Sequence, residues 1–375
     1  MRVLFTAPAA AGHIFPMVPT AQALRSAGHQ VLFAGSAPLE TLCNTGLPVV
    51  EIGDGTGIGE AFQRITKDEP RYVAKDRTQE EILELAALGF AEHGRVAIDG
   101  LLRVATEWRP DIMVMEPFAS AAPLVAAKLG IPTLVHNFGV MPGLPMLDRL
   151  AEILSAEYQA HSVAGPGERT VIDVVPASLG GDGGGWRVRY VPFNGGGVVP
   201  SDLVGRSERR RIAVTLGTVL TEYAGVNPIA WLTEQAAEVD ADFLLAVGSA
   251  DLSPLGTLPD NIRPLPWTPL AELLDVSDAV IHHGGSGTML TAAVAGVPQL
   301  ILPQGADHFI NVDAAVAKGY GLRSDSDSVD ATLLTRLLDD KTLRDAAAAL
   351  QDEIDELPSP AALVGDFERL YRETR

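Results

Sequence analysis

Basic residues and cysteine are both scarce in this sequence. Its 375 residues include 28 Lys and Arg against 48 Asp and Glu, so the formal net charge is −20. Nucleic acids and anionic membranes are bound through clustered Lys and Arg, so this balance argues against both as partners. The single cysteine, Cys43, excludes an internal disulfide and a cysteine-based metal site. We expect its thiol to be buried as a small apolar group.

Long hydrophobic runs are missing as well. No stretch approaches the roughly 20 apolar residues that a membrane-spanning helix needs. Residues 1–6 lead directly into a strand pattern, without an apolar signal region or a small-residue cleavage site. We therefore expect a soluble, cytoplasmic protein. The length exceeds that of one usual hydrophobic core, which favours two domains of similar size.

The first half of the chain alternates short apolar runs with helical patterns. Strands are expected at 3–7, 30–34, 111–115 and 133–135, and helices at 16–27 and 121–129. Gly28 and Gly130 follow the two helices and end them. This alternation predicts an α/β fold with a parallel sheet and crossover helices.

A glycine-rich segment separates the two halves. Residues 178–200 hold too much glycine for regular elements, and we place the domain boundary there. Beyond it, strands expected at 212–216, 243–247, 279–282 and 299–302 restart the same alternation. The sequence therefore predicts an N-terminal domain over 1–205 with a linker at about 178–205, and a C-terminal domain over 206–357. We expect a final helix within 358–375 to pack back on the N-terminal domain.

The segment His-His-Gly-Gly-Ser-Gly-Thr at 282–288 joins the strand expected at 279–282 to a helix expected at 288–295. Ligands of parallel sheets bind outside the carboxyl ends of the strands, and a helix N-terminus offers N–H groups and a positive dipole end to a phosphate. The hydroxyls of Ser286 and Thr288 and the imidazole of His283 add hydrogen-bond donors. The segment therefore predicts a diphosphate site.

This segment has other interpretations. The glycines could form only a tight turn beside packed histidines. The segment is no Walker loop, because no Gly-Lys-Ser/Thr follows, and no dinucleotide fingerprint follows the first strand. Kinase and NAD-dependent dehydrogenase functions are therefore disfavoured.

A candidate base lies after the first strand. His13 stands directly before a helix, and an imidazole there can take up a proton near pH 7. Glu116 ends the strand expected at 111–115, and parallel neighbours bring such ends together. A carboxylate that holds one ring N–H would leave the other nitrogen as the base. A lone histidine beside a glycine, however, is more often a cap or a packing residue.

Together these motifs resemble those of GT-B glycosyltransferases of the family 1 type, which use UDP- or dTDP-sugars, and in particular actinobacterial natural-product glycosyltransferases. The resemblance covers the whole chain and is most specific at 267–270, 281–288, 295–299 and 303–308. It implies two Rossmann-like domains whose parallel sheets face each other across a cleft. The N-terminal domain would bind the acceptor and the C-terminal domain the nucleotide sugar.

The resemblance also implies roles for particular residues. His13 would be the base and Glu116 its partner, at a position where many members have aspartate. His308 stands where many members have glutamine, and a core position is the alternative for Trp267. The residues implied to contact the donor are Gly12, Thr218, Trp267, Thr268, His283, Gly285, Ser286, Gly287, Thr288, Asp307 and His308.

The acceptor side is expected in residues 54–100 and 137–165. Phe62, Phe90, Phe138 and Met141 lie there and indicate an apolar acceptor such as a polyketide or an aromatic aglycone, although ordinary packing explains them nearly as well. The resemblance implies inverting transfer of a sugar, plausibly a deoxysugar from dTDP, by a hexosyltransferase without metal or cofactor.

Two alternatives stay open at this point. One is a UDP-glucose-dependent sterol or lipid glucosyltransferase, and the other is a catalytically inactive nucleotide-binding partner protein. The sequence is also compatible with assembly as a homodimer.

Overall fold

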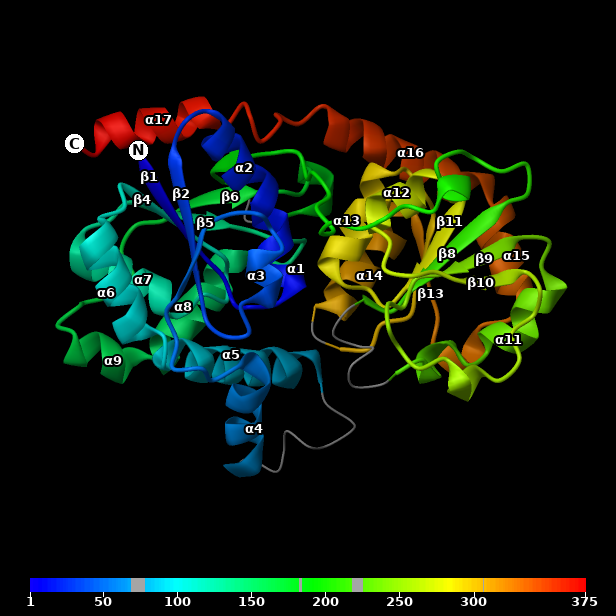
Figure 1. The fold of residues 1–375 in the computed structure, drawn as a ribbon, viewed down its shortest axis with the longest axis horizontal. Coiled ribbons are helices and arrows are strands. Elements are labelled where there is room, and N and C mark those ends of the chain that lie inside the picture. The colour runs from blue at the N-terminus through cyan, green and yellow to red at the C-terminus, as the bar shows by residue number, and fades with distance from the viewer. Residues whose placement is uncertain (69–77, 182–183, 218–224, 306) are drawn as a thin grey trace. The chain divides into compact units, whose positions relative to one another are not determined.

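The computed structural model describes residues 1–68, 78–181, 184–217, 225–305 and 307–375. Its contacts divide the chain into two compact units (Figure 1). Unit 1 comprises residues 1–191 and 357–375, and unit 2 comprises residues 192–356. Each unit is built around a parallel sheet of its own.

The sheet of unit 1 has the strand order β3-β2-β1-β4-β5-β6-β7, with every pair parallel. The strands are β1 (Arg2–Thr6), β2 (Gln30–Gly35), β3 (Val49–Glu51), β4 (Ile112–Met115), β5 (Thr133–His136), β6 (Thr170–Asp173) and β7 (Trp186–Arg187). The order reverses direction between β1 and β4. Each residue of β4 and β5 is buried, which is typical of parallel strands covered on both faces.

The helices of unit 1 follow the strands in the usual alternation. They are α1 (Ala11–Ile14), α2 (Val18–Ser26), α3 (Glu40–Cys43), α4 (Ile58–Asp68), α5 (Gln79–Arg95), α6 (Ile98–Trp108), α7 (Ala121–Leu129), α8 (Gly143–Ile153), α9 (Ser155–Ala160) and α17 (Val364–Glu373). A capping box starts α5: the Thr78 hydroxyl accepts from the Glu81 N–H, and the Glu81 carboxylate accepts from the Thr78 N–H.

Unit 2 repeats this architecture with the strand order β10-β9-β8-β11-β12-β13. Its strands are β8 (Arg211–Thr215), β9 (Asp242–Leu245), β10 (Ile262–Pro264), β11 (Ala279–His282), β12 (Gln299–Ile301) and β13 (Gly321–Arg323). Its helices are α11 (Leu232–Gln235), α12 (Leu270–Asp275), α13 (Ser286–Val294), α14 (His308–Lys318), α15 (Ala331–Asp339) and α16 (Lys341–Asp355).

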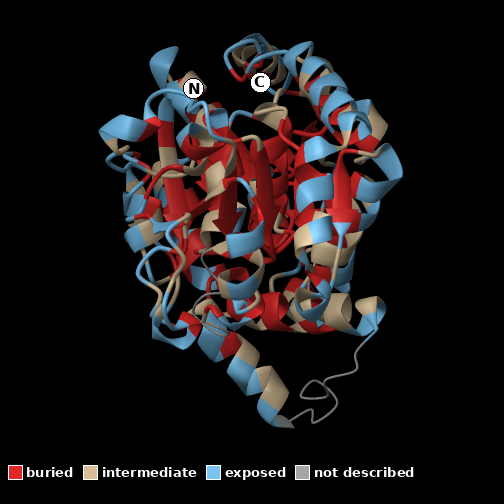
Figure 2. Ribbon diagram, turned by 90° about the vertical axis from the view of Figure 1, so that its right-hand side faces the viewer, coloured by how far each residue is buried: buried red, intermediate tan, exposed pale blue. Residues whose placement is uncertain are grey.

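Alternate residues of the β8 strand enter two different hydrophobic clusters. Ile212 and Val214 belong to one cluster and Ala213 to the other. Because successive side chains of a strand point to opposite faces, each face of this sheet carries its own core. Buried strands surrounded by helices with exposed outer sides are visible in Figure 2.

The predicted α/β class with two Rossmann-like sheets is confirmed. The strands that the sequence did not predict are short and lie at or near the sheet edges: β3, β6, β7, β10 and β13. The β7 strand falls inside the glycine-rich segment that was expected to lack regular elements. Its Trp186 packs against Phe367 of α17, with ring centroids 5.4 Å apart, and this tertiary contact supports a strand that composition alone disfavours.

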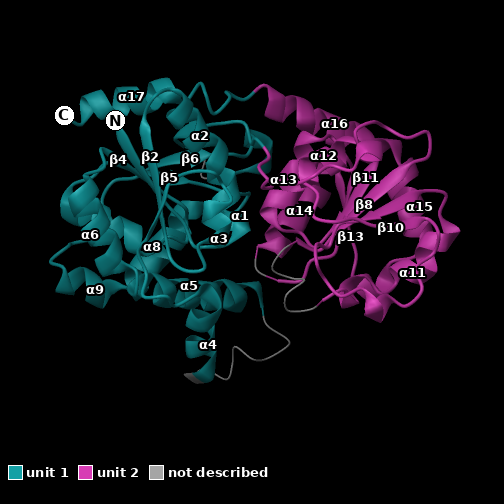
Figure 3. Cartoon of the chain, viewed as in Figure 1, with its two compact units in different colours: residues 1–191, 357–375 teal, residues 192–356 magenta. Residues whose placement is uncertain are grey.

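The division between the units falls at residue 191/192, earlier than the expected 205/206 (Figure 3). Residues 194–203 are held by unit 2. Asn194 accepts a hydrogen bond from the Ala271 N–H at 2.9 Å, and Leu203 is buried in a unit 2 cluster. The glycine-rich composition suggested a linker, whereas these contacts make the segment part of the second unit. The α17 helix belongs to unit 1.

Two further expectations concern Cys43 and membranes. Cys43 ends α3 and is exposed, so the expectation of a buried thiol is wrong. The buried residue of this helix is its neighbour Leu42. Within the described part of the chain, no helix is both long enough and apolar enough to cross a bilayer.

Phe367→Ala should lower the free energy of unfolding by about 3–5 kcal/mol, because it removes a fully buried ring from the contact between α17 and β7. Chemical denaturation followed by circular dichroism measures this. Arg372→Ala on the exposed side of the same helix is the control and should change stability by less than about 0.5 kcal/mol. Equal stability of the two variants would contradict the docking of α17.

Candidate active site

In each unit the strand order reverses at one point, and ligands of open α/β sheets bind outside the carboxyl ends of the strands there. In unit 1 this point lies between β1 and β4. His13 lies in α1, which follows β1, and Glu116 directly follows β4. The Glu116 N–H donates to the Thr6 carbonyl at 3.1 Å, so the pairing of the two strands continues up to the glutamate.

The side chains of His13 and Glu116 are hydrogen-bonded, as the sequence predicted. Nδ1 of His13 lies 2.8 Å from Oε1 of Glu116, whose side chain is fully buried. The other carboxylate oxygen accepts from the Phe118 N–H at 2.8 Å. A carboxylate with both oxygens engaged is fixed in place, and it favours the tautomer in which Nδ1 carries the ring proton. The arrangement can therefore present Nε2 of His13 as a proton acceptor.

Aromatic rings surround the imidazole. The ring centroids of Phe90, Phe118 and Phe138 lie 5.2, 5.3 and 5.4 Å from that of His13. Phe62 contacts Phe90 edge to face at 5.4 Å, so it extends the cluster outward. The sequence indicated Phe62, Phe90 and Phe138 but not Phe118. Its position two residues after Glu116 was the signal that could have placed it near His13.

The α5 helix approaches the loop after β4 closely. The Ser120 hydroxyl donates to the Phe90 carbonyl at 2.8 Å, and Gly94 packs directly against Ser120. Gly89 leaves room for the ring of Phe62. Small residues on α5 therefore let the helix carry Phe90 to His13. Met141 is buried in the segment before α8.

His93 is a second imidazole on this face of α5, and the sequence did not single it out. It is 5% exposed, and its Nε2 has no hydrogen-bond partner among the described residues. Burial, with a smaller contribution from nearby His13, lowers the pKa of His93 to about 4. His93 is therefore neutral at pH 7.

In unit 2 the strand order reverses between β8 and β11. The segment predicted to bind a diphosphate follows β11, and α13 begins at Ser286, two residues earlier than expected. Gly287 and Thr288 therefore also belong to its first turn, where N–H groups have no acceptor within the helix. Gly285 precedes the helix and has no side chain to cap it. This helix terminus can receive an anion.

Two glycines confine the ring of His283. A Cβ atom at Gly285 would lie 2.5 Å from Nε2 of His283, and one at Gly217 would lie 2.5 Å from its Cε1. His308 contacts the ring edge to face at 4.9 Å. Burial, with smaller contributions from His308 and His282, holds the pKa of His283 well below its usual range. His283 is thus a neutral imidazole that can donate an N–H, rather than a cation.

His282 is part of the framework of the turn. It is 1% exposed, its Nε2 pairs with Oε1 of Gln299 at 2.9 Å, and its Nδ1 accepts from the Gly284 N–H at 3.1 Å. Gln299 in turn donates to the Met289 carbonyl at 3.1 Å. Both ring nitrogens are therefore engaged in shaping the turn.

The Ser286 hydroxyl is engaged within the protein. It donates to Oδ2 of Asp307 at 2.6 Å, whereas the sequence suggested it as a donor to the diphosphate. The backbone N–H of Ser286, in the first turn of α13, is the group left for that role. Asn311, which sequence reasoning missed, contacts both Ser286 and Asp307.

The other residues predicted to contact the donor substrate lie in different surroundings. Trp267 is 48% exposed on unit 2, so it is not a core aromatic. The Thr268 hydroxyl donates to the Pro266 carbonyl at 3.0 Å. Gly12 lies in α1 with no neighbour around its Cβ position. Thr218 lies outside the described residues.

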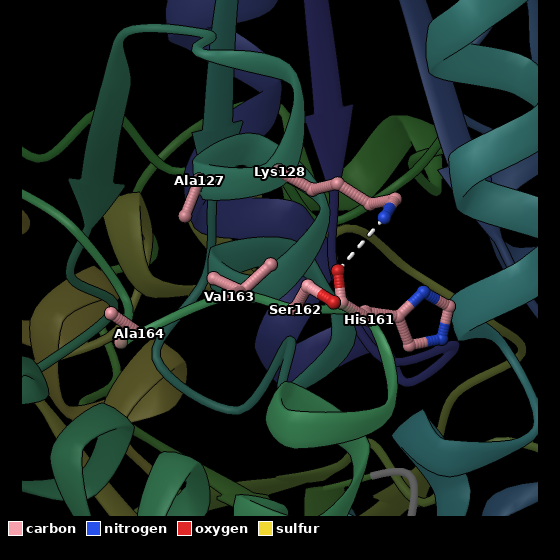
Figure 4. Close-up of a pocket in the computed structure, with 7 residues that line it drawn as sticks. Ala127, Lys128, His161, Ser162, Val163 and Ala164 are labelled. Atoms are coloured by element: carbon pink, nitrogen blue, oxygen red, sulfur yellow. Dashed lines mark hydrogen bonds between the residues drawn. The ribbon is translucent and has the colours of Figure 1, made fainter.

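A surface pocket lies elsewhere on unit 1 (Figure 4). Its lining residues are Ala127, Lys128, His161, Ser162, Val163, Ala164 and Gly165. The Lys128 ammonium donates a hydrogen bond to the His161 carbonyl at 2.9 Å. The pocket lies at the C-terminal end of α7, whereas the N-terminal end of α7 is next to Glu116. It therefore belongs to the opposite edge of the sheet and contains no predicted site residue.

Comparisons with known proteins identify the family. The model of the erythromycin biosynthesis protein CIII-like N-terminal domain matches residues 22–217, and that of the C-terminal domain matches residues 230–370. The chain is 39% identical to elloramycin glycosyltransferase ElmGT of Streptomyces olivaceus, over 96% of this chain and 95% of that protein. The chain belongs to the EryCIII-like glycosyltransferase family.

Solved structures agree with this family. The glycosyltransferase SnogD of Streptomyces nogalater is 38% identical and superposes with a TM-score of 0.85, covering 99% of both chains. SsfS6 of Streptomyces sp. SF2575, solved with thymidine diphosphate, is 28% identical with a TM-score of 0.84, over 98% of this chain and 99% of that one. The protein is thus a glycosyltransferase with the GT-B fold.

Gly285→Ala should weaken binding of dTDP to this glycosyltransferase at least tenfold, because the new methyl group would displace the His283 ring. Gly285 has an ordinary φ of −63°, so the substitution adds no backbone strain and tests space alone. Isothermal titration calorimetry measures the Kd. Gly205→Ala in the same unit, with no atom near its Cβ position, is the control and should bind as the wild type does. An unchanged Kd in Gly285→Ala would argue against His283 as a ligand contact.

The buried histidines should make the enzyme sensitive to mild acid. Burial lowers the pKa of both His93 and His282 to about 4, from about 6.5 in the unfolded chain. As the pH falls from 6.5 toward 4, the unfolded chain binds protons that the folded protein does not, so stability declines.

Each such group accounts for about 2 kcal/mol between pH 7 and pH 5. His93→Leu removes one titrating group without breaking a hydrogen bond among the described residues. We expect its unfolding free energy to fall less steeply over this range in denaturant titrations. A slope identical to that of the wild type would contradict a depressed pKa at His93.

Proposed function

We propose that this enzyme is an inverting glycosyltransferase that transfers a sugar, in particular a deoxysugar, from dTDP to a hydroxyl of a small apolar natural product. The observation that carries the proposal is the His13–Glu116 hydrogen bond at the reversal point of the unit 1 sheet. It supplies the base that such a transfer needs. Elloramycin glycosyltransferase and the dTDP-bound SsfS6 support the choice of acceptor and nucleotide.

The transfer itself involves one proton and two bonds at the sugar. Nε2 of His13 takes the proton of the acceptor hydroxyl as its oxygen attacks the anomeric carbon. A new carbon–oxygen bond forms while the bond from that carbon to the diphosphate oxygen breaks, and the electron pair leaves with dTDP. Attack opposite to the leaving group inverts the anomeric configuration. Glu116 stabilises the imidazolium that forms.

The leaving diphosphate gains negative charge as its bond to the sugar breaks. The N–H groups at the start of α13 and the imidazole of His283 are preorganised donors for this charge. Gly285, Ser286, Gly287 and Thr288 supply this turn, and Asp307 and His308 would contact the sugar. Because hydrogen-bond donors stabilise the diphosphate directly, we propose that the transfer requires neither a metal ion nor a cofactor.

Trp267 and Thr268 are proposed to bind the nucleobase. The half-exposed indole of Trp267 can stack on a pyrimidine, and the backbone of Thr268 can form hydrogen bonds with it. Thr218 and Gly12 are proposed as further donor contacts, on the strength of the family resemblance.

The aromatic cluster around His13 is proposed to bind the acceptor. Phe62, Phe90, Phe118 and Phe138 present rings that stack or pack edge to face with a planar aglycone, and Met141 would extend this apolar wall. An apolar environment also strengthens the electrostatic contribution of the His13–Glu116 pair.

The alternatives fit the observations less well. A catalytically inactive partner has no need of a fully buried carboxylate that orients a histidine. The relative ElmGT is named for elloramycin rather than for a sterol or lipid acceptor. We propose that the reaction takes place in the cytoplasm, where nucleotide-activated sugars are available. A homodimer would be detected by sedimentation analysis of the purified enzyme.

His13→Ala should lower kcat for transfer from dTDP-sugars about 100- to 10,000-fold while leaving the Kd for dTDP unchanged. Glu116→Gln should also lower kcat, because a neutral amide stabilises the imidazolium less. Product formation with aromatic aglycones is followed by liquid chromatography and mass spectrometry. Glu152→Gln, on the exposed surface of α8, is the control and should keep full activity. A fully active His13→Ala enzyme would end the proposal.

A further inference from the structure

Asn311 is the fourth residue of α14 and is fully buried. Its amide group lies among three acceptors. Nδ2 is 2.8 Å from the Gly284 carbonyl, 2.9 Å from Oδ2 of Asp307 and 3.0 Å from Oγ of Ser286. An amide has two N–H groups, so one donates to Gly284 and the other is shared between Ser286 and Asp307.

These acceptors belong to two different loops. Gly284 and Ser286 lie in the turn between β11 and α13, and Asp307 lies in the loop between β12 and α14. The Ser286 hydroxyl closes the network by donating its single proton to Oδ2 of Asp307. Linked hydrogen bonds between buried groups make a site more rigid and leave it few alternative arrangements.

The network also fixes the orientation of the Asp307 carboxylate. Oδ2 receives hydrogen bonds from Ser286 and Asn311, whereas Oδ1 receives none from the described residues. With Oδ2 held in place, Oδ1 has a defined direction in which to accept a hydroxyl proton. The Gly284 carbonyl is held by the same amide, so the start of α13 is fixed relative to this carboxylate.

We propose that Asn311 is a positioning residue that couples recognition of the donor diphosphate at α13 to recognition of the donor sugar at Asp307. This inference rests on the proposed function, since it assumes a nucleotide sugar at these two loops. Asn311 touches neither part of the donor itself. It acts through Gly284, Ser286 and Asp307.

Asn311→Leu tests the proposal because leucine has a similar size and no hydrogen-bond donor. The readouts are the melting temperature and the Kd values for dTDP and dTDP-glucose, measured by calorimetry without an acceptor. We expect the affinity for dTDP to fall about tenfold or more. The affinity for dTDP-glucose should fall by a larger factor, because Asp307 loses its orientation as well.

Asn261→Leu is a matched control in the same unit. The Asn261 amide also has three acceptors, the carbonyls of Ala236, Ala241 and Val239 at 2.7, 3.0 and 3.4 Å. It directly precedes β10, at the opposite edge of the sheet from α13. We expect this variant to lose stability and keep the wild-type Kd for both ligands. Equal affinity losses in Asn261→Leu and Asn311→Leu would reduce Asn311 to a purely structural role and overturn the proposal.

Asn311→Asp decides the question if Asn311→Leu does not fold. Its carboxylate cannot donate to Gly284 and repels Asp307, but it can donate once protonated. Relative to the wild type at each pH, its affinity for dTDP should recover as the pH falls from 8 to 6. Wild-type affinity at pH 8 would overturn the proposal.

Two further outcomes distinguish a failure of the role proposed for Asn311 from a failure of the proposed function. Equal losses of affinity for dTDP and dTDP-glucose in Asn311→Leu would overturn the coupling to Asp307. A wild-type enzyme that binds neither ligand would instead refute the proposed function.

Discussion

The hydrogen bond from His13 to the buried Glu116 carboxylate is the interaction on which the proposed catalysis depends. It exists because β1 and β4 are parallel neighbours, so that the residues after both strands meet at one edge of the sheet. The Phe118 N–H holds the second carboxylate oxygen. The strand pairing thus fixes the carboxylate, and the carboxylate fixes the imidazole. In the proposed mechanism the surrounding rings limit where an acceptor hydroxyl can approach.

Unit 2 has the same sheet geometry, but its proposed role is to stabilise negative charge rather than to accept a proton. A protein with a net charge of −20 must bind a diphosphate, and the segment 282–288 at the reversal point of its sheet contains no Lys, Arg, Asp or Glu. Burial keeps His283 uncharged, and α13 contributes N–H groups and its dipole. Such donors have fixed directions, so they can match the charge that develops on a leaving diphosphate better than a mobile surface cation could. In our proposal the Asn311 network holds these directions.

The sequence predicted the features that a local pattern of residues determines. It did not predict the features that depend on how distant segments pack together. The central strands β1, β4, β8 and β11 each contain a run of at least three apolar residues, and glycines marked the turn before α13. The pairing of His13 with Glu116 followed from the rule for parallel strand ends. Asn311 lies inside a helix and resembles any surface amide in the sequence. Its role, like the burial of His93 and the exposure of Cys43, depends on which segments pack around it.

The tautomer of His13 tests the central claim most directly. Labelling of the eight histidines with ¹⁵N, with His13→Gln used to assign the signal, allows the two ring nitrogens to be distinguished by their chemical shifts. The account predicts that neutral His13 carries its proton on Nδ1, against Glu116, and that Nε2 is unprotonated. A proton on Nε2 in the neutral wild-type enzyme would contradict the assignment of His13 as the base held by Glu116.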